Sequence, residues 1–216
     1  MDLFTGNLLV ASSLVTEPVY AGGVCLIVHQ DETNVIGVML NRPMQPNPEA
    51  LAAILDQQPK STFTNRLAKR ETSSTHHEFG SHSGGSKQSN FPHPMLGMLH
   101  FGGPLSGPVV AIHQTSQYAE AETGAGIYVA AQKQHLENLV REQSSPYRLI
   151  VGHLGWEWDQ LDAEIDAGIW HVIPASAEAV FTPAKEMWRQ LIRRATSSSM
   201  ARWMGVPDAV DASELN

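Results

Sequence analysis

The chain has 216 residues, of which 42% are hydrophobic, and its formal net charge is −8. This length suits one domain with a sizeable core, and the hydrophobic content is ordinary for a soluble globular protein. No apolar run approaches the roughly 20 residues that a membrane-spanning helix needs. The start of the chain has no basic segment of the kind that opens a signal peptide. A lone cysteine, Cys25, lies in an apolar run and fits a buried residue in a reducing cytoplasm.

The charge is unevenly distributed along the chain. Residues 1–58 and 97–182 hold four basic and sixteen acidic residues, a net charge of −12. An acidic body repels phosphates, whose neutralisation supplies most of the nonspecific affinity for nucleic acids. A nucleic-acid partner is therefore disfavoured for this part of the chain, and a membrane partner is not expected.

The first half of the chain predicts a short apolar element followed by a hairpin. Residues 7–13 form the apolar element, and residues 24–29 and 35–40 form two β-branched runs separated by a polar segment. Asn47-Pro48-Glu49 has the features of a helix start, with Asn as N-cap and Pro in the first position.

Residues 59–95 have a different composition, rich in Ser, Thr, His, Gly and Lys. Such a segment buries too little apolar surface to offset its ordering entropy, so we predict a mobile insertion. A metal site is conceivable because imidazole is a common ligand, but the segment's four histidines match no defined zinc pattern, so a solvated loop is favoured and we expect neither a metal site nor a cofactor. These histidines are His76, His77, His82 and His93.

The second half predicts four strands and two helices, followed by a last strand and the C-terminal region. The strands are expected at 95–101, 108–113, 127–130 and 149–151, and a helix at 133–142. After a Gly-x-x-Gly turn at 152–155, a short helix should begin near Glu157 or Asp159 and end at Gly168, with Gln160 and Glu164 on a face away from its buried stripe.

A last strand is expected at 168–173, and the C-terminal region follows it. Residues 183–196 predict an amphipathic helix with a basic outer face formed by Lys185, Arg189, Arg193 and Arg194. Residues 197–216 predict a frayed or disordered tail. Residues 1–182 should form one α+β domain around the insertion, because strands and helices mix without a steady βαβ alternation.

Four motifs together resemble the YqgE/AlgH family of bacterial proteins. They are residues 6–11, residues 37–43, Gly102-Gly103-Pro104-Leu105, and Gly155-Trp156 leading into residues 160–165. The resemblance covers roughly residues 5–58 and 96–180. It implies a compact α+β domain with a branched, twisted sheet flanked by helices. The family is regarded as a group of transcriptional regulators without an established biochemical activity.

One candidate site is formed by residues at turns and element ends, where binding residues collect. We expect these residues to lie together and to contact an unknown protein or small ligand: Asn41, Gly102, Gly103, Pro104, Trp156, Gln160 and Glu164. The alternative is that they are packing devices, and this alternative has the greater weight.

Two other functions stay open. An enzyme, of hydrolase or transferase type, would use His153 or Glu164, but no nucleophile elbow, zinc-protease motif or phosphate-binding loop is present, so catalytic residues are not assigned. A nucleic-acid-associated regulator would use the basic C-terminal helix.

Overall fold

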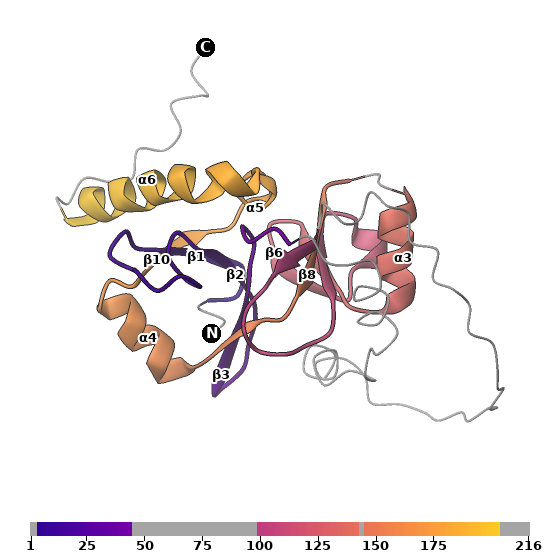
Figure 1. Ribbon diagram of the computed structural model, residues 1–216, viewed down its shortest axis with the longest axis horizontal. Coiled ribbons are helices and arrows are strands. Elements are labelled where there is room, and N and C mark those ends of the chain that lie inside the picture. Colours follow the sequence, from indigo (N-terminus) through magenta and orange to yellow (C-terminus); the bar gives the residue numbers. More distant parts are fainter. Residues whose placement is uncertain (1–3, 45–98, 143–144, 204–216) are drawn as a thin grey trace, which may run out of the picture.

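The computed structural model describes residues 4–44, 99–142 and 145–203, with side chains described as far as residue 197 (Figure 1). The predicted helix start at Asn47 and the predicted insertion with its four histidines lie outside these ranges. Within them, none of the helices combines the length and apolar character that crossing a bilayer needs.

The described strands form two five-stranded sheets. The first, sheet A, has the order β10-β1-β2-β3-β9 and is antiparallel throughout. Its strands are β1 (Asn7–Ala11), β2 (Val24–Gln30), β3 (Asn34–Met39), β9 (Leu154–Glu157) and β10 (Trp170–Pro174). The predicted hairpin is confirmed as the β2–β3 pair.

The second sheet, sheet B, has the order β4-β8-β5-β7-β6 and one parallel pair, β4 with β8. Its strands are β4 (Leu99–Phe101), β5 (Val110–His113), β6 (Ala121–Gly124), β7 (Ile127–Ala130) and β8 (Tyr147–Val151). Two isolated bridges, Pro43 with His100 and Leu105 with His153, extend the pairing beyond the strands. The α+β class is confirmed, and the expected branched sheet takes the form of these two sheets.

The helices are α3 (Lys133–Glu142), α4 (Trp158–Asp166), α5 (Ala177–Phe181) and α6 (Ala184–Trp203), with a short 3-10 helix at Ser116–Tyr118. Two predictions need correction here. Residues 154–157 form strand β9 rather than the second half of a turn, because pairing with β3 overrides their weak local preference. Helix α6 continues to Trp203, so its expected end at residue 196 is too early.

The core is layered, as the alternation of buried side chains along β1 and β2 requires. Leu8, Val10 and Leu26 face sheet B and the inner face of α6, while Leu9 and Cys25 face the opposite side, toward α4. Helix α3 covers the far face of sheet B with Leu136, Leu139 and Val140. Figure 1 shows the resulting order from α4 through the two sheets to α3, with α6 alongside sheet A.

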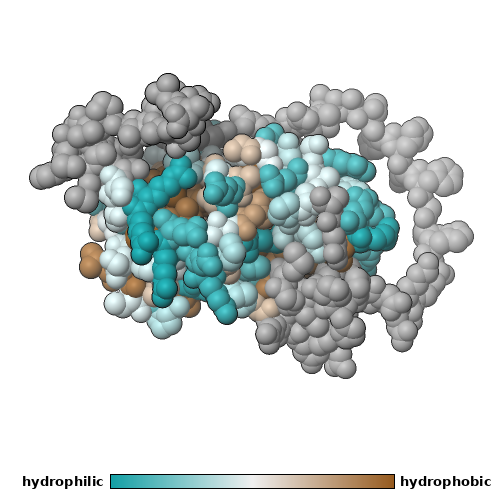
Figure 2. All heavy atoms as spheres, turned by 90° about the horizontal axis from the view of Figure 1, so that it is seen from above, coloured by the Kyte–Doolittle hydropathy of each residue, from teal (hydrophilic) through white to brown (hydrophobic). Residues whose placement is uncertain are grey.

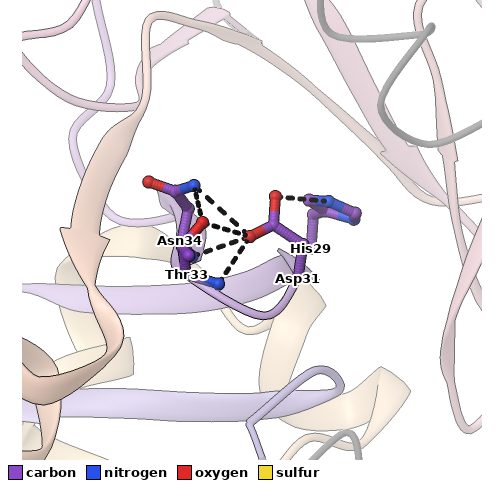
Figure 3. Close-up of polar contacts among 4 residues, drawn as sticks. All are labelled: His29, Asp31, Thr33 and Asn34. Carbon is purple, nitrogen blue, oxygen red and sulfur yellow. Dashed lines mark hydrogen bonds and ion pairs between the residues drawn. The ribbon is translucent and has the colours of Figure 1, made fainter.

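The β2–β3 hairpin is closed by Asp31, whose side chain forms an Asx turn (Figure 3). Its Oδ1 accepts hydrogen bonds from the backbone N–H groups of Thr33 at 2.9 Å and Asn34 at 2.8 Å. These bonds favour the charged carboxylate, so the pKa of Asp31 falls to about 2. The hairpin positions β3, whose other edge pairs with β9.

A buried arginine attaches sheet B to the segment after β10. The guanidinium of Arg148 donates to the carbonyl oxygen of Val180 at 2.8 Å and to that of Thr182, and it lies 2.9 Å from Nε2 of His100. Burial lowers the pKa of Arg148 to about 10. This residue therefore fixes the position of α5, and with it the start of α6.

Candidate functional site

A cleft of about 620 Å³ opens beside α4 on the outer side of sheet A. Three segments enclose it: the β1–β2 loop, the loop between β4 and β5, and the run from β9 through α4 to β10. The lining residues that carry its chemistry are Leu14, Glu17, Tyr20, Leu105, Trp156, Gln160, Glu164, Ile169 and Trp170. A volume of this size is within the range of ligand-binding pockets.

The carboxylate of Glu164 is the polar centre of the cleft. Its Oε2 accepts hydrogen bonds from the indole N–H of Trp156 at 3.0 Å and from that of Trp170 at 2.8 Å. Its Oε1 accepts one from the side-chain amide of Gln160 at 2.8 Å. Hydrogen bonds to an ionised acceptor are stronger than neutral ones, so Glu164 holds α4 against both edge strands of sheet A.

The aromatic wall of the cleft is formed by Tyr20, Trp156 and Trp170. The ring centroids of Trp156 and Trp170 are 6.2 Å apart at 89°, and those of Tyr20 and Trp170 are 6.3 Å apart at 81°. Both pairs have the edge-to-face geometry that aromatic rings favour. Burial and the nearby carboxylates of Glu17 and Glu164 raise the pKa of Tyr20.

The rim of the cleft is apolar and exposed. Among the described residues, the exposed large hydrophobic side chains are Leu14 at 82%, Leu105 at 47% and Ile169 at 37%. All three line this cleft, and each comes from a different one of its three segments. Gathered exposed apolar side chains mark an interaction surface more often than isolated ones do.

The structure brings together four of the seven predicted site residues, Pro104, Trp156, Gln160 and Glu164. The expected pairing of Gln160 with Glu164 is present. The expected placement of Glu164 away from buried groups is wrong, since Glu164 is half-buried and bonds two largely buried tryptophans. Helical spacing predicts the direction of a side chain, but it does not predict that two strands place indole groups beside that side chain.

Asn41 does not line the cleft, so the structure does not bring it together with the other predicted site residues. It is buried, and its Oδ1 accepts a hydrogen bond from the backbone N–H of Val24 at 3.0 Å. Its Nδ2 donates to the carbonyl oxygen of Gly22 at 2.8 Å. Asn41 therefore caps the start of β2, which is the packing alternative that the sequence had left open.

Gly102 and Gly103 also lie outside the cleft lining and form a close backbone crossing with Gly152 and His153. The backbone N–H of Gly102 donates to the carbonyl oxygen of Val151 at 2.7 Å. A Cβ on Gly103, where φ is +155°, would lie 2.3 Å from the backbone of His153. These glycines allow the close approach of two backbone segments of the same chain.

Of the two residues considered for an enzyme, Glu164 lines the cleft and His153 does not. His153 is absent from the lining and lies in the bridge with Leu105, and its ring packs beside Gly107. The described residues include no group of three or more side chains that could hold a metal ion.

Several cleft residues were not predicted from the sequence, above all Leu14, Glu17, Tyr20 and Ile169. The first three lie in the β1–β2 loop, far from α4 in sequence. The available signal was Leu14-Val15 placed between polar residues in a segment that Pro18 breaks, an unusual place for apolar side chains.

The basic residues predicted for the C-terminal helix are exposed on α6, away from the cleft. Lys185, Arg189, Arg193 and Arg194 are all exposed. Figure 2 views the molecule from above, the side on which α6 lies in Figure 1, and hydrophilic side chains gather there. None of the four forms an ion pair with another residue in the described ranges.

The chain is similar in sequence to proteins of several bacteria. A UPF0301 protein of Chlorobaculum tepidum is 27% identical over 198 residues, which cover 87% of this chain and 84% of the relative. A UPF0301 protein of Anaeromyxobacter dehalogenans is 26% identical over 188 residues, covering 86% and 85%.

Two solved structures share the fold. The solution structure of the AlgH protein from Pseudomonas aeruginosa matches with a TM-score of 0.60 and 18% identity, covering 97% of this chain and 96% of that one. A crystal structure of a Corynebacterium diphtheriae protein matches with a TM-score of 0.60 and 22% identity, covering 90% and 88%. The family model described as AlgH-like matches residues 8–199. The resemblance carried by the four sequence motifs is thus confirmed, and the chain belongs to the AlgH-like family.

Proposed function

We propose that this protein is a regulatory binding domain that contacts its partner through the cleft beside α4. One observation carries the proposal: the exposed large hydrophobic residues of the described chain, Leu14, Leu105 and Ile169, all surround this one opening. Exposed apolar surface costs free energy that a partner recovers by covering it, at about 25 cal/mol per Å². The lone buried Cys25 supports a reducing, cytoplasmic setting.

Binding fits the chemistry of the cleft better than catalysis does. Its central carboxylate, Glu164, already accepts three hydrogen bonds from the protein. The observed role of Glu164 is thus to hold the wall of the cleft, and no described histidine or cysteine lines the cleft to share a proton transfer with a carboxylate. The enzyme alternative therefore has less support than a contact surface.

The test compares what the cleft captures in three forms of the protein. We would incubate the wild type, the rim variant L14S/L105S and the control Gln134→Ser, which is exposed on α3, with native lysate and quantify bound proteins and small molecules by mass spectrometry. Ligands held by the wild type and the control should be lost from the rim variant. Equal capture by all three, with circular dichroism confirming a folded rim variant, would argue against the proposal.

A second candidate function is contact with a nucleic acid through α6. The favouring observation is the four-residue spacing of Lys185, Arg189 and Arg193, which aligns three exposed cations on one helix face without a carboxylate partner among the described residues. Against it stands the acidic body of the chain, which repels phosphates.

Salt dependence separates this candidate from the cleft proposal. Anisotropy of a labelled 20-base-pair duplex would be measured from 50 to 200 mM KCl. Three phosphate contacts predict a fall in affinity with a slope of about −2.7 in log–log form. A flat response, or an unchanged one in the variant K185E/R189E/R193E, would exclude a charge-driven contact by this helix.

A further inference from the structure

The cleft has a single sign of charge. Its charged lining residues are Glu17 and Glu164, and no lysine, arginine or histidine is found among the described residues that line it. The outer side of α4 adds Asp159, Asp162 and Asp166, which are all exposed. An occupant therefore meets a negative potential, which low-dielectric apolar walls strengthen.

The two cleft carboxylates have different roles. Glu164 is half-buried and is held by the two indole N–H groups and by Gln160. Glu17 is exposed at the other side of the opening, and its carboxylate accepts no hydrogen bond from any residue in the described ranges. Glu17 is thus available to a ligand, whereas Glu164 supplies fixed charge and holds the wall.

The aromatic wall of the cleft suits a cation on an apolar stem. Tyr20 and Trp170 form a T-shaped pair in the lining that also contains both carboxylates, and Trp170 donates to Glu164. Aromatic faces attract guanidinium and ammonium groups. Burial raises the pKa of Tyr20, and the carboxylates of Glu17 and Glu164 raise it further. The same two charges would stabilise a positive group at this position.

The rim indicates an occupant larger than the cleft. Leu14 is 82% exposed, so a small molecule inside the cleft would leave most of this side chain in water. Leu105 and Ile169 extend the apolar surface on two other segments. A peptide segment with apolar residues on both sides of a central basic one would cover all three.

We propose that the cleft binds a partner's peptide segment that presents an arginine or lysine side chain between apolar residues, with Glu17 pairing with the cation and Tyr20 and Trp170 contacting its stem. The inference rests on the proposed function, because it names the ligand chemistry of the same cleft. It assigns to Glu17 the selectivity of the site and to Leu14, Leu105 and Ile169 its affinity.

The first experiment selects peptides by their charge. Phage displaying random dodecapeptides would be panned against the wild type, the charge reversal Glu17→Lys, and the control Glu122→Lys, which makes the same change of charge at an exposed position on β6. The wild type and the control should enrich arginine or lysine flanked by apolar residues. Glu17→Lys should lose this preference and enrich acidic residues.

The second experiment measures one selected peptide in matched neutral form. Replacing its arginine by citrulline, or its lysine by norleucine, should weaken binding to the wild type about tenfold, the loss of one charge-assisted contact. The replacement should have little effect on binding to Glu17→Gln.

The outcomes separate the two proposals. Selected peptides that bind the wild type but not L14S/L105S need the rim. If such peptides are neutral or acidic, they would overturn the cationic specificity and leave the binding cleft intact. Selections that give no peptide dependent on the rim would overturn both. An equal citrulline penalty in the wild type and Glu17→Gln would remove Glu17 from the contact.

Discussion

At the residue scale, Glu164 shows how one carboxylate can fix a site wall. It accepts hydrogen bonds from two tryptophans on different strands and from Gln160 on its own helix. Because Trp156 and Trp170 are 7% and 3% exposed, their indole N–H groups have little access to water when this acceptor is removed.

We expect Glu164→Ala to destabilise the protein by about 1–3 kcal/mol, since the buried indole N–H groups of Trp156 and Trp170 lose the one oxygen that both of them bond. Urea denaturation followed by tryptophan fluorescence measures this loss. Gln160→Ala removes only an exposed partner and should cost less than about 0.5 kcal/mol. Equal costs for the two variants would contradict the role of Glu164 as the acceptor for both tryptophans.

Asn41 gives a second prediction at the residue scale: it should matter for stability and not for binding in the cleft. Asn41→Ala should destabilise the protein by about 2 kcal/mol, because the backbone N–H of Val24 loses its acceptor inside the core. Peptide selection by the cleft should stay unchanged. Thermal unfolding and the panning experiment check these two parts, and a stable variant with altered selection would return Asn41 to the site.

His113 makes stability depend on pH. It is fully buried, and burial, followed by the charge of His135, lowers its pKa to about 4. The unfolded chain, with a histidine pKa near 6.5, takes up this proton first. Stability should therefore fall as the pH drops from about 6.5 to 4, by up to about 3 kcal/mol.

The control for this prediction is His113→Leu, which has no titrating group. Denaturation midpoints would be compared at pH 7, 5.5 and 4.5. The wild type should lose more stability than the variant over this range. Parallel pH profiles would mean that other groups, such as the carboxylates, cause the whole loss.

At the element scale, the β4–β5 and β8–β9 connections cross closely, and this limits which residues can stand at the crossing. Gly103 and Gly152 lie so close that a Cβ on either would come within 2.3 Å of the opposite backbone. The same crossing delivers Leu105 to one side of the cleft and Leu154 to its wall. Gly102 and Gly103 are thus connected to the cleft through geometry and not through contact, whereas Pro104 lines it.

Gly103→Ala should cost about 3 kcal/mol or more, because backbone and not a flexible side chain has to move. Gly155→Ala is the matched control, since its Cβ would meet only the tip of Leu105 at 3.1 Å. Midpoints of thermal unfolding give the comparison. A Gly103 variant as stable as the control would show that the two connections can separate without penalty.

At the scale of the whole molecule, the two sheets share one core. Leu8 and Val10 of sheet A belong to the same buried cluster as Ile112 and Val129 of sheet B, together with Met187 of α6. Neither sheet can therefore expose its inner face without the other doing so. A shared core of this kind favours a single cooperative transition.

Two spectroscopic probes test that cooperativity, because the aromatic residues are divided between the sheets. Trp156 and Trp170 are in sheet A, whereas Tyr128 and Tyr147 are in sheet B. Urea transitions followed by tryptophan fluorescence and by far-ultraviolet circular dichroism should coincide. A fluorescence midpoint at clearly lower urea would show that sheet A unfolds on its own.

The sequence by itself determined the family, the β2–β3 hairpin, helices α3 and α4, and the buried face of α6. Each of these depends on periodicity or on residues close together in the chain, where burial of one face decides the local structure. The spacing that pairs Gln160 with Glu164 is of the same kind.

Only the tertiary structure decided which residues form the cleft. Leu14, Tyr20 and Trp170 converge because β1 pairs with both β2 and β10, which brings the β1–β2 loop beside the end of α4. The same register placed Asn41 at the start of β2, where it bonds the backbone of Val24 and Gly22, and away from the opening of the cleft. Strand register and the packing of two sheets are long-range properties, and no short stretch of this sequence encodes them alone.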